Sequence, residues 1–268
     1  MSGSLMLSGR RAVVFGGGGS IGAAVARELA GEGAEVFIAG RSSGSLEAVA
    51  AQITAAGGRA HTDVVDALNA EAVEDYVESI VRRSGGLDIE FNATGPRISH
   101  YGNGKPAVDL TSDEFMTPLQ TVLRSQFITA RAAAAPMARQ GSGVIIFLTG
   151  SPAKPHGPGT AGIGAAFGAI ENLTRTLAIE LGRAGVRVVC IRTAANPDTR
   201  TIRDTTSALS EITGLPAEQL NAGFADATLL GVSPCTTDTA RVAAFLASDA
   251  ARVMTGTVLN SSAGACVD

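Results

Sequence analysis

The chain has 268 residues, of which 45% are hydrophobic and 17% charged, and its formal net charge is −4. This acidic balance and the low aromatic content of 4% argue against a surface that binds a nucleic-acid backbone or stacks on bases. No apolar run reaches the length of a membrane span, and the first residues do not resemble a signal peptide. The three cysteines, Cys190, Cys235 and Cys266, lack metal-ligand spacing, so we expect a reduced, cytoplasmic protein without a metal site.

Short apolar segments alternate with helix-like segments along the chain. We expect strands at residues 12–15, 35–39, 59–64, 87–91, 144–148, 186–191 and 257–260. Helices are expected between them, at residues 21–29, 45–56, 66–83, 112–139, 159–181 and 238–248. Apolar strands that each precede a helix predict a parallel sheet with helices on both faces. No linker divides the sequence, so we predict one α/β domain over residues 1–268.

Residues 193–234 interrupt this alternation. Their sequence is irregular except for a short amphipathic stretch near residues 206–212. Long irregular segments in compact domains usually cover a ligand. We therefore predict a substrate lid at residues 193–234, with a disordered insertion as the alternative.

A glycine-rich turn lies between the first predicted strand and the first predicted helix. Residues 16–22 read GGGGSIG. Glycine lets the backbone approach a pyrophosphate, and the free N–H groups at a helix start attract the anion. The order strand, turn, helix therefore predicts a nucleotide site.

Five sequence blocks, taken in order, resemble the short-chain dehydrogenase/reductase (SDR) family over nearly the whole chain. They are the glycine turn, Asp63 after the third strand, residues 92–95 (NATG) after the fourth, and residues 248–251 and 255–259 near the end. The resemblance implies a doubly wound Rossmann sheet that binds a nicotinamide cofactor. The cofactor contacts that it implies are Gly16, Gly18, Ser20, Ile21, Gly22, Asp63, Val64, Asn92, Ala93 and Thr94.

The choice between NADP and NAD depends on the end of the second strand. An acidic residue there would bind the ribose 2′-hydroxyl of NAD, but this chain has Arg41 and Ser42. A guanidinium and a hydroxyl suit a 2′-phosphate, so we predict NADP(H). The alternative is that Arg41 is only a solvated loop charge.

The resemblance fails at the catalytic residues. Residues 173–181 resemble the family's L-T-R-x-L-A-x-E-L and fix the register. The family's Asn, Ser, Tyr and Lys then fall on Val122, Gly150, Ile163 and Phe167, and none of these transfers a proton. In the family, Tyr is the general acid or base, Lys lowers its pKa, Ser orients the carbonyl and Asn holds a water. Substitutes in the loops after the fourth and fifth strands are Tyr101, Ser151 and His156, with His100 and Lys154 beside them; the alternative for each is a solvated side chain.

Three functions fit these observations. The first is an NADP(H)-dependent oxidoreductase that reduces an activated C=C, C=N or C=O of a small molecule without Tyr and Lys. The second is a non-redox cyclase, isomerase or dehydratase, and the third is a non-catalytic binding partner. We expect the first. The family usually dimerises and tetramerises through helices at about 112–139 and 159–181, so we expect a homodimer or homotetramer, with a hetero-oligomer as the alternative.

Overall fold

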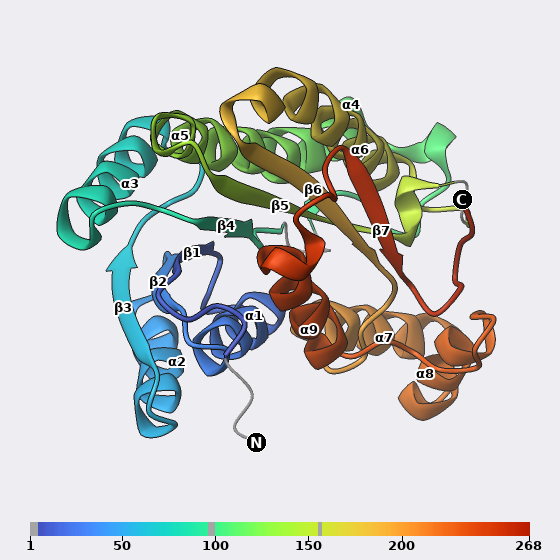
Figure 1. The fold of residues 1–268 in the computed structure, drawn as a ribbon. Coiled ribbons are helices and arrows are strands. Elements are labelled where there is room, and N and C mark those ends of the chain that lie inside the picture. The colour runs from blue at the N-terminus through green and yellow to red at the C-terminus, as the bar shows by residue number, and fades with distance from the viewer. Residues whose placement is uncertain (1–4, 96–99, 155–156) are drawn as a thin grey trace.

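A computed structural model describes residues 5–95, 100–154 and 157–268, and their strands form a seven-stranded parallel sheet (Figure 1). The order in the sheet is β3-β2-β1-β4-β5-β6-β7. The strands are β1 (Arg11–Phe15), β2 (Glu35–Gly40), β3 (Arg59–Val64), β4 (Ile89–Asn92), β5 (Gly143–Gly150), β6 (Val186–Thr193) and β7 (Thr257–Ser261). The predicted doubly wound α/β fold is confirmed.

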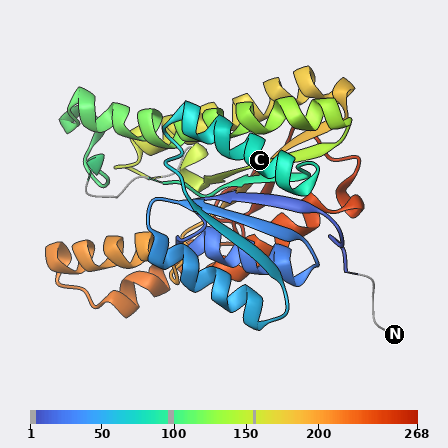
Figure 2. The same ribbon diagram turned by 90° about the vertical axis from the view of Figure 1, so that its left-hand side faces the viewer.

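Helices cover both faces of the sheet, as the apolar strands require (Figures 1 and 2). Side chains alternate across each strand, so Val14 and Ile38 belong to one apolar core and Val13 and Phe37 to the other. The first core is closed by α1 (Ser20–Gly31), α2 (Ser43–Ala55) and α9 (Thr236–Ala247). The second is closed by α3 (Ala70–Ser84), α5 (Arg124–Gln140) and α6 (Ala161–Leu181).

The strand order reverses between β1 and β4, which lie side by side although two strands separate them in sequence. Phe15 at the end of β1 pairs with Asn92 at the end of β4. In sheets of this type, ligands bind outside the carboxyl ends of the strands at such a switch point. The glycine turn and residues 92–95 therefore meet at the place where a nucleotide is expected.

The segment predicted as one helix at residues 112–139 consists of three parts. These are α4 (Ser112–Pro118), a π-helical turn η3 (Leu119–Leu123) and α5. A capping box between Thr111 and Glu114 starts α4, and Pro118, which has no N–H to donate, precedes the π-helical turn. Val122, one of the four positions matched to the catalytic set, is buried in this turn.

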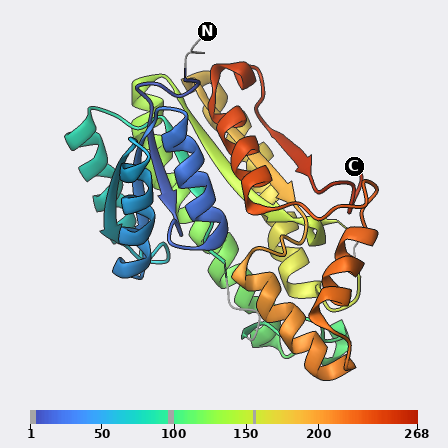
Figure 3. The same ribbon diagram turned by 90° about the horizontal axis from the view of Figure 1, so that it is seen from below.

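The segment at residues 193–234 is largely helical, so its reading as an irregular stretch is wrong. It contains α7 (Arg200–Thr213) and α8 (Ala217–Asp226). The hydroxyl of Thr199 accepts the N–H of Ile202 at the start of α7, and Gly214 ends α7 at a φ of +71°. The α7–α8 pair and α4 extend beyond the same end of the sheet, from opposite faces (Figures 2 and 3). The role of this segment as a substrate lid stays a prediction.

Four short 3₁₀ helices complete the described secondary structure: η2 (Ala107–Asp109), η4 (Ser151–Ala153), η5 (Gly182–Ala184) and η6 (Asp249–Ala251). Within the described ranges, no helix has the length and apolarity needed to cross a membrane.

Candidate functional site

The glycine turn after β1 has close backbone contacts that side chains would block. Gly16 has a φ of +71°, and a Cβ there would lie 3.0 Å from the backbone nitrogen of Thr94. A Cβ on Gly18 would lie 2.3 Å from Oγ of Ser45, and one on Gly22 would lie 2.4 Å from the carbonyl oxygen of Gly16. The turn is therefore specified as glycine by contacts within the chain, and it leaves the start of α1 open to an anion.

Ser20 connects this turn to α7. It is the first residue of α1, and its Oγ accepts the backbone N–H of Arg200 at 3.2 Å. The loop before α7 is fixed at a second point, because the carboxylate of Asp198 accepts the N–H and the hydroxyl of Thr236 at the start of α9. The beginning of the α7–α8 pair is thus anchored beside the predicted pyrophosphate position.

The end of β2 exposes the two residues expected to select the cofactor. Arg41 and Ser42 are both exposed, and Ser42 is the N-cap of α2 with no side-chain cap hydrogen bond. The backbone oxygen of Ser42 accepts the hydroxyl of Ser45, which lies next to Gly18. Arg41 thus directly precedes Ser42, the N-cap of α2, and Ser45 in the first turn of α2 lies beside the glycine turn.

Asn92 has an internal role at the end of β4. Its side chain is fully buried, its amide donates to Oγ1 of Thr129 at 3.0 Å, and its Oδ1 accepts the N–H of Thr94 at 2.7 Å. The N–H of Ala93 donates a hydrogen bond to the carbonyl oxygen of Phe15. The side chain of Asn92 thus shapes the loop that approaches Gly16.

The remaining predicted cofactor residues lie at the carboxyl end of β3 and in α1. Asp63 is partly exposed and its Oδ2 lies 3.8 Å from Arg83, while Val64 beside it is 64% exposed. Ile21 is half-buried against the first core. Asp63 and Val64 are accessible from the sheet edge beyond β2, where an adenine would extend from the glycine turn.

The positions matched to the family's Ser and Lys face each other. A Cβ on Gly150 would lie 3.2 Å from Cε2 of Phe167, so the phenylalanine ring occupies the space into which a side chain at 150 would extend. Val122 and Ile163 are buried in the same apolar cluster, against which Phe167 packs. The structure therefore brings these four positions to one apolar core, and their side chains offer no group for proton transfer.

Tyr101 belongs to the same cluster and is 8% exposed. The loop that contains it is fixed to the start of α6, because the N–H of Gly104 is donated to the carbonyl oxygen of Gly159, four residues before Ile163. Burial raises the pKa of Tyr101 to about 12, so its hydroxyl holds its proton at neutral pH. It is suited to donate a hydrogen bond rather than to exchange a proton.

The other predicted substitutes lie elsewhere or have partners. Ser151 is buried, and its hydroxyl is 3.5 Å from the carbonyl oxygen of Thr193. His100 is exposed, and Lys154 pairs with Asp268. His156 lies outside the described residues.

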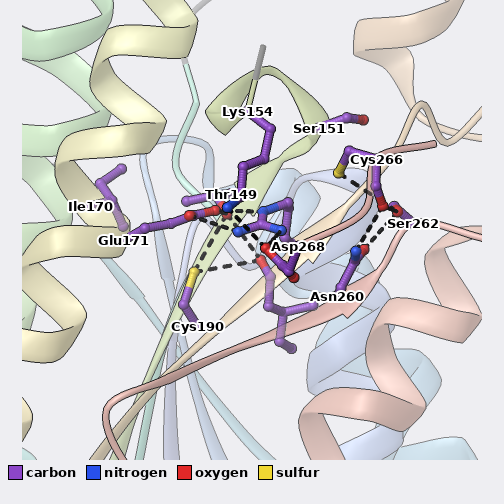
Figure 4. A network of polar contacts seen from close by, with 12 residues as sticks. Thr149, Ser151, Lys154, Ile170, Glu171, Cys190, Asn260, Ser262, Cys266 and Asp268 are labelled. Atoms are coloured by element: carbon purple, nitrogen blue, oxygen red, sulfur yellow. Dashed lines mark hydrogen bonds and ion pairs between the residues drawn. The ribbon is translucent and has the colours of Figure 1, made fainter. Parts of the chain in front are cut away.

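A charged network beside this cluster was missed by the sequence analysis. Arg192, in β6, is 1% exposed and donates from Nε and Nη2 to the two carboxylate oxygens of Glu171, each at 2.7 Å. Its Nη1 donates to Oδ1 of Asp268 at 2.6 Å, and Nζ of Lys154 lies 3.0 Å from the same oxygen. Figure 4 shows Glu171, Lys154 and Asp268 converging in this network, while Ser151 points away from it. An arginine ending an apolar strand was the signal in the sequence.

The cysteines are free thiols in this structure. Cys190 is buried, which raises the pKa of its thiol to about 12, whereas Cys235 and Cys266 are partly exposed. In the described part of the chain, no three His, Cys, Asp or Glu side chains gather in a way that would hold a metal ion.

The comparisons with known proteins agree with this geometry. A family model described as enoyl-(acyl carrier protein) reductase matches residues 17–265. The 4-formylbenzenesulfonate dehydrogenase of Comamonas testosteroni is 32% identical over 254 residues, which are 94% of this chain and 96% of that protein. The chain belongs to the short-chain dehydrogenase/reductase family. The resemblance inferred from the motifs is therefore confirmed, and the chain is a member of a family of dehydrogenases and reductases.

Solved SDR structures superimpose on nearly the whole chain. The structure of levodione reductase has a TM-score of 0.86 at 28% identity and covers 96% of this chain and 97% of its own. The structure of NAD⁺-bound xylitol dehydrogenase has a TM-score of 0.88 at 26% identity and covers 96% and 99%. The SDR scaffold is thus present from the glycine turn to β7.

Proposed function

We propose that this SDR is an NADP(H)-dependent oxidoreductase that reduces an activated C=C, C=N or C=O bond without a catalytic Tyr and Lys. The observation that supports this proposal most is the close packing around the glycine turn. At Gly16, Gly18 and Gly22, neighbouring atoms lie within 3.0 Å of where a Cβ would stand, while the positions for Tyr and Lys are apolar. The glycine turn thus supports nucleotide binding, while the matched positions lack the residues for proton transfer.

The residues present fit NADP(H). The N–H groups of the glycine turn and the start of α1 would hold the pyrophosphate, and Arg41 with Ser42 would hold the 2′-phosphate. When bound, the cofactor supplies a hydride to the substrate. The xylitol dehydrogenase structure was solved with NAD⁺, so Arg41 is the feature of this chain that supports NADP(H).

The chain's own residues suit a substrate that needs little proton transfer. Phe167, Ile163 and Val122 exclude water from the place where a polar catalytic set would lie. Tyr101 keeps its proton at neutral pH and would donate a hydrogen bond to a substrate oxygen that gains negative charge. A conjugated C=C or an iminium fits best, because hydride addition to an iminium gives a neutral amine, and hydride addition to a conjugated C=C gives an enolate that is less basic than the alkoxide from a ketone.

The test is a titration of NADPH and NADH followed by nicotinamide fluorescence. We expect tighter binding of NADPH, and Arg41→Ala should weaken NADPH about tenfold or more while leaving NADH nearly unchanged. The control is Arg59→Ala. Arg59 is an exposed arginine at the start of β3, whereas Arg41 follows the end of β2. Equal loss of both cofactors in Arg41→Ala would disprove the NADP(H) assignment.

The role of Tyr101 has its own test. Tyr101→Phe should lower the turnover of an activated alkene by roughly a hundredfold and leave the NADPH dissociation constant unchanged. An unchanged rate would remove Tyr101 from the proposal.

A non-redox enzyme is the second candidate function, and the packing of Phe167 against Gly150 favours it. Apolar side chains at these positions would shape a substrate for cyclisation, isomerisation or dehydration without a hydride. Absence of NADPH and NADH binding would favour this function, or a non-catalytic binding role, over the reductase.

We further propose a homodimer or homotetramer formed through α5 and α6. Phe127 on α5 and Ile179 on α6 are 44% and 82% exposed, and an interface through these helices would bury both side chains. The measurement is the molar mass in solution by light scattering, and a monomer at micromolar concentration would disprove this.

A further inference from the structure

The network around Arg192 contains more charged groups than its buried ion pair with Glu171 requires. Glu171 satisfies Nε and Nη2 of Arg192 and balances its charge. The remaining Nη1 contacts Asp268, a residue whose side chain is 49% exposed. A second cation, Lys154, contacts the same oxygen of Asp268. Two cations that meet one carboxylate oxygen are the arrangement of a carboxylate-binding site.

Asp268 is attached mainly through its side chain. The backbone carbonyl of Cys266 is fixed by the amide of Asn260, but no backbone hydrogen bond of residues 267–268 is found within the described ranges. Val267 is 70% exposed. The two cations hold the pKa of Asp268 below its usual range, mainly through the hydrogen bond from Arg192, so the occupant is an ionised carboxylate. Its displacement would break the two side-chain contacts and, in the part of the chain that the structure describes, no backbone hydrogen bond of residues 267–268.

The pair of cations lies beside the positions matched to the catalytic residues. Lys154 follows Gly150 by four residues, and Glu171 follows Phe167 by about one helical turn. Arg192 directly precedes Thr193, which pairs with Gly150 across β5 and β6. An anionic group held by Lys154 and Arg192 would thus be close to a substrate that lies next to these matched positions.

We propose that Arg192 and Lys154 form a binding site for the carboxylate of an organic acid, and that Asp268 fills this site in the free protein. A carboxylate-bearing substrate exchanges with Asp268 and leaves the charge of the network unchanged, because one carboxylate replaces another. The inference names the substrate class of the proposed reductase and rests on that proposal, although binding at the site requires no turnover.

The test measures binding of benzoate, with its neutral isostere benzamide, by calorimetry at fixed ionic strength. In Asp268→Asn, which removes the internal carboxylate, benzoate should bind about tenfold more tightly than in the unmodified protein, because the site is no longer occupied. Benzamide should show no such gain. Lys154→Met added to Asp268→Asn should abolish the gain.

Asp249→Asn is the matched control, since Asp249 is an exposed carboxylate paired with Arg10 far from the network. It should not change benzoate binding. Equal benzoate affinity in Asp268→Asn and the unmodified protein, or an equal gain for benzamide, would overturn the proposal. NADPH is titrated into the same variants. Intact NADPH binding without the gain in benzoate affinity would overturn only the carboxylate site. A gain in benzoate affinity without NADPH binding would overturn only the proposed reductase activity.

Discussion

Gly150 and Phe167 share one space, because a Cβ on Gly150 would lie 3.2 Å from the phenylalanine ring. The φ of Gly150 is −133°, so a side chain there meets no backbone strain and the ring alone opposes it. We expect Gly150→Ser to lower the free energy of unfolding by about 1–3 kcal/mol. In a Phe167→Ala background the same change should cost about 1 kcal/mol less.

Urea unfolding of the four proteins measures this coupling. Gly157→Ser is the control, since a Cβ on Gly157 would have nothing within 4 Å, and it should change stability by less than about 0.5 kcal/mol. Equal costs of Gly150→Ser in both backgrounds would show that the ring does not fill this space.

Restoring the proton-transfer residues should restore carbonyl reduction. The variant Gly150→Ser, Ile163→Tyr, Phe167→Lys removes the ring that blocks the serine and places a phenol beside an ammonium group. We expect NADPH-dependent reduction of a small aromatic aldehyde to rise by roughly 10²–10⁴-fold, the usual contribution of general acid catalysis.

The control for this variant carries Phe in place of Tyr at position 163 and therefore lacks the hydroxyl. Both rates are followed by the loss of NADPH absorbance. If the restored variant is folded, binds NADPH and is no faster than its control, the assignment of Ile163 to the Tyr position is wrong.

The close approach at Gly16 predicts a stability cost beyond backbone strain. Gly16 and Gly57 have φ values of +71° and +85°, but a Cβ on Gly57 would have nothing within 4 Å. In each alanine variant, the left-handed conformation costs about 1 kcal/mol of stability. Gly16→Ala should cost about 1–3 kcal/mol more, because its methyl group meets the backbone of Ala93 and Thr94. Chemical denaturation of the two variants gives the difference, and similar losses would contradict it.

Glu90 should make the protein less stable as the pH rises. Its side chain is fully buried in β4, and neither carboxyl oxygen has a hydrogen-bond partner among the described residues. Burial raises the pKa of Glu90 from 4.5 to about 8. Between these values the folded protein binds one proton more than the unfolded chain, so the free energy of unfolding falls by about 1.4 kcal/mol per pH unit.

Glu90→Gln should remove this contribution and flatten the pH profile from about pH 5 to 8. The measurement is urea unfolding of both proteins across that range, with the exposed Glu47→Gln as the control. Parallel pH profiles for the Glu90 variant and the unmodified protein would contradict the prediction.

The sequence predicted the parts of the fold that local pattern determines. Apolar strands and amphipathic helices alternate, and the strand–turn–helix at residues 16–22 places the glycine turn at the switch point. The register of residues 173–181 also placed Gly150 and Phe167 at matched positions. That their side chains would compete for one space depends on how α6 packs on β5, which spacing along the chain does not reveal.

The charged network was missed for a similar reason. The sequence analysis did not consider Arg192, and its partner Asp268 lies 76 residues further on, so no local pattern joins the two. Of the α7–α8 pair, the sequence analysis noted only the amphipathic stretch near residues 206–212, which belongs to α7. It missed α8, which buries none of its side chains. A local hydrogen bond from Ile202 to Thr199 starts α7.

Ser20 joins parts of the chain that are 180 residues apart, since it begins α1 and accepts the N–H of Arg200. A phosphate that binds at the start of α1 therefore also meets the first residue of the α7–α8 pair. The proposed binding of the nucleotide would then be linked to the position of the α7–α8 pair through one hydroxyl. Steady-state kinetics should accordingly show compulsory ordered addition, with the nucleotide entering first and leaving last.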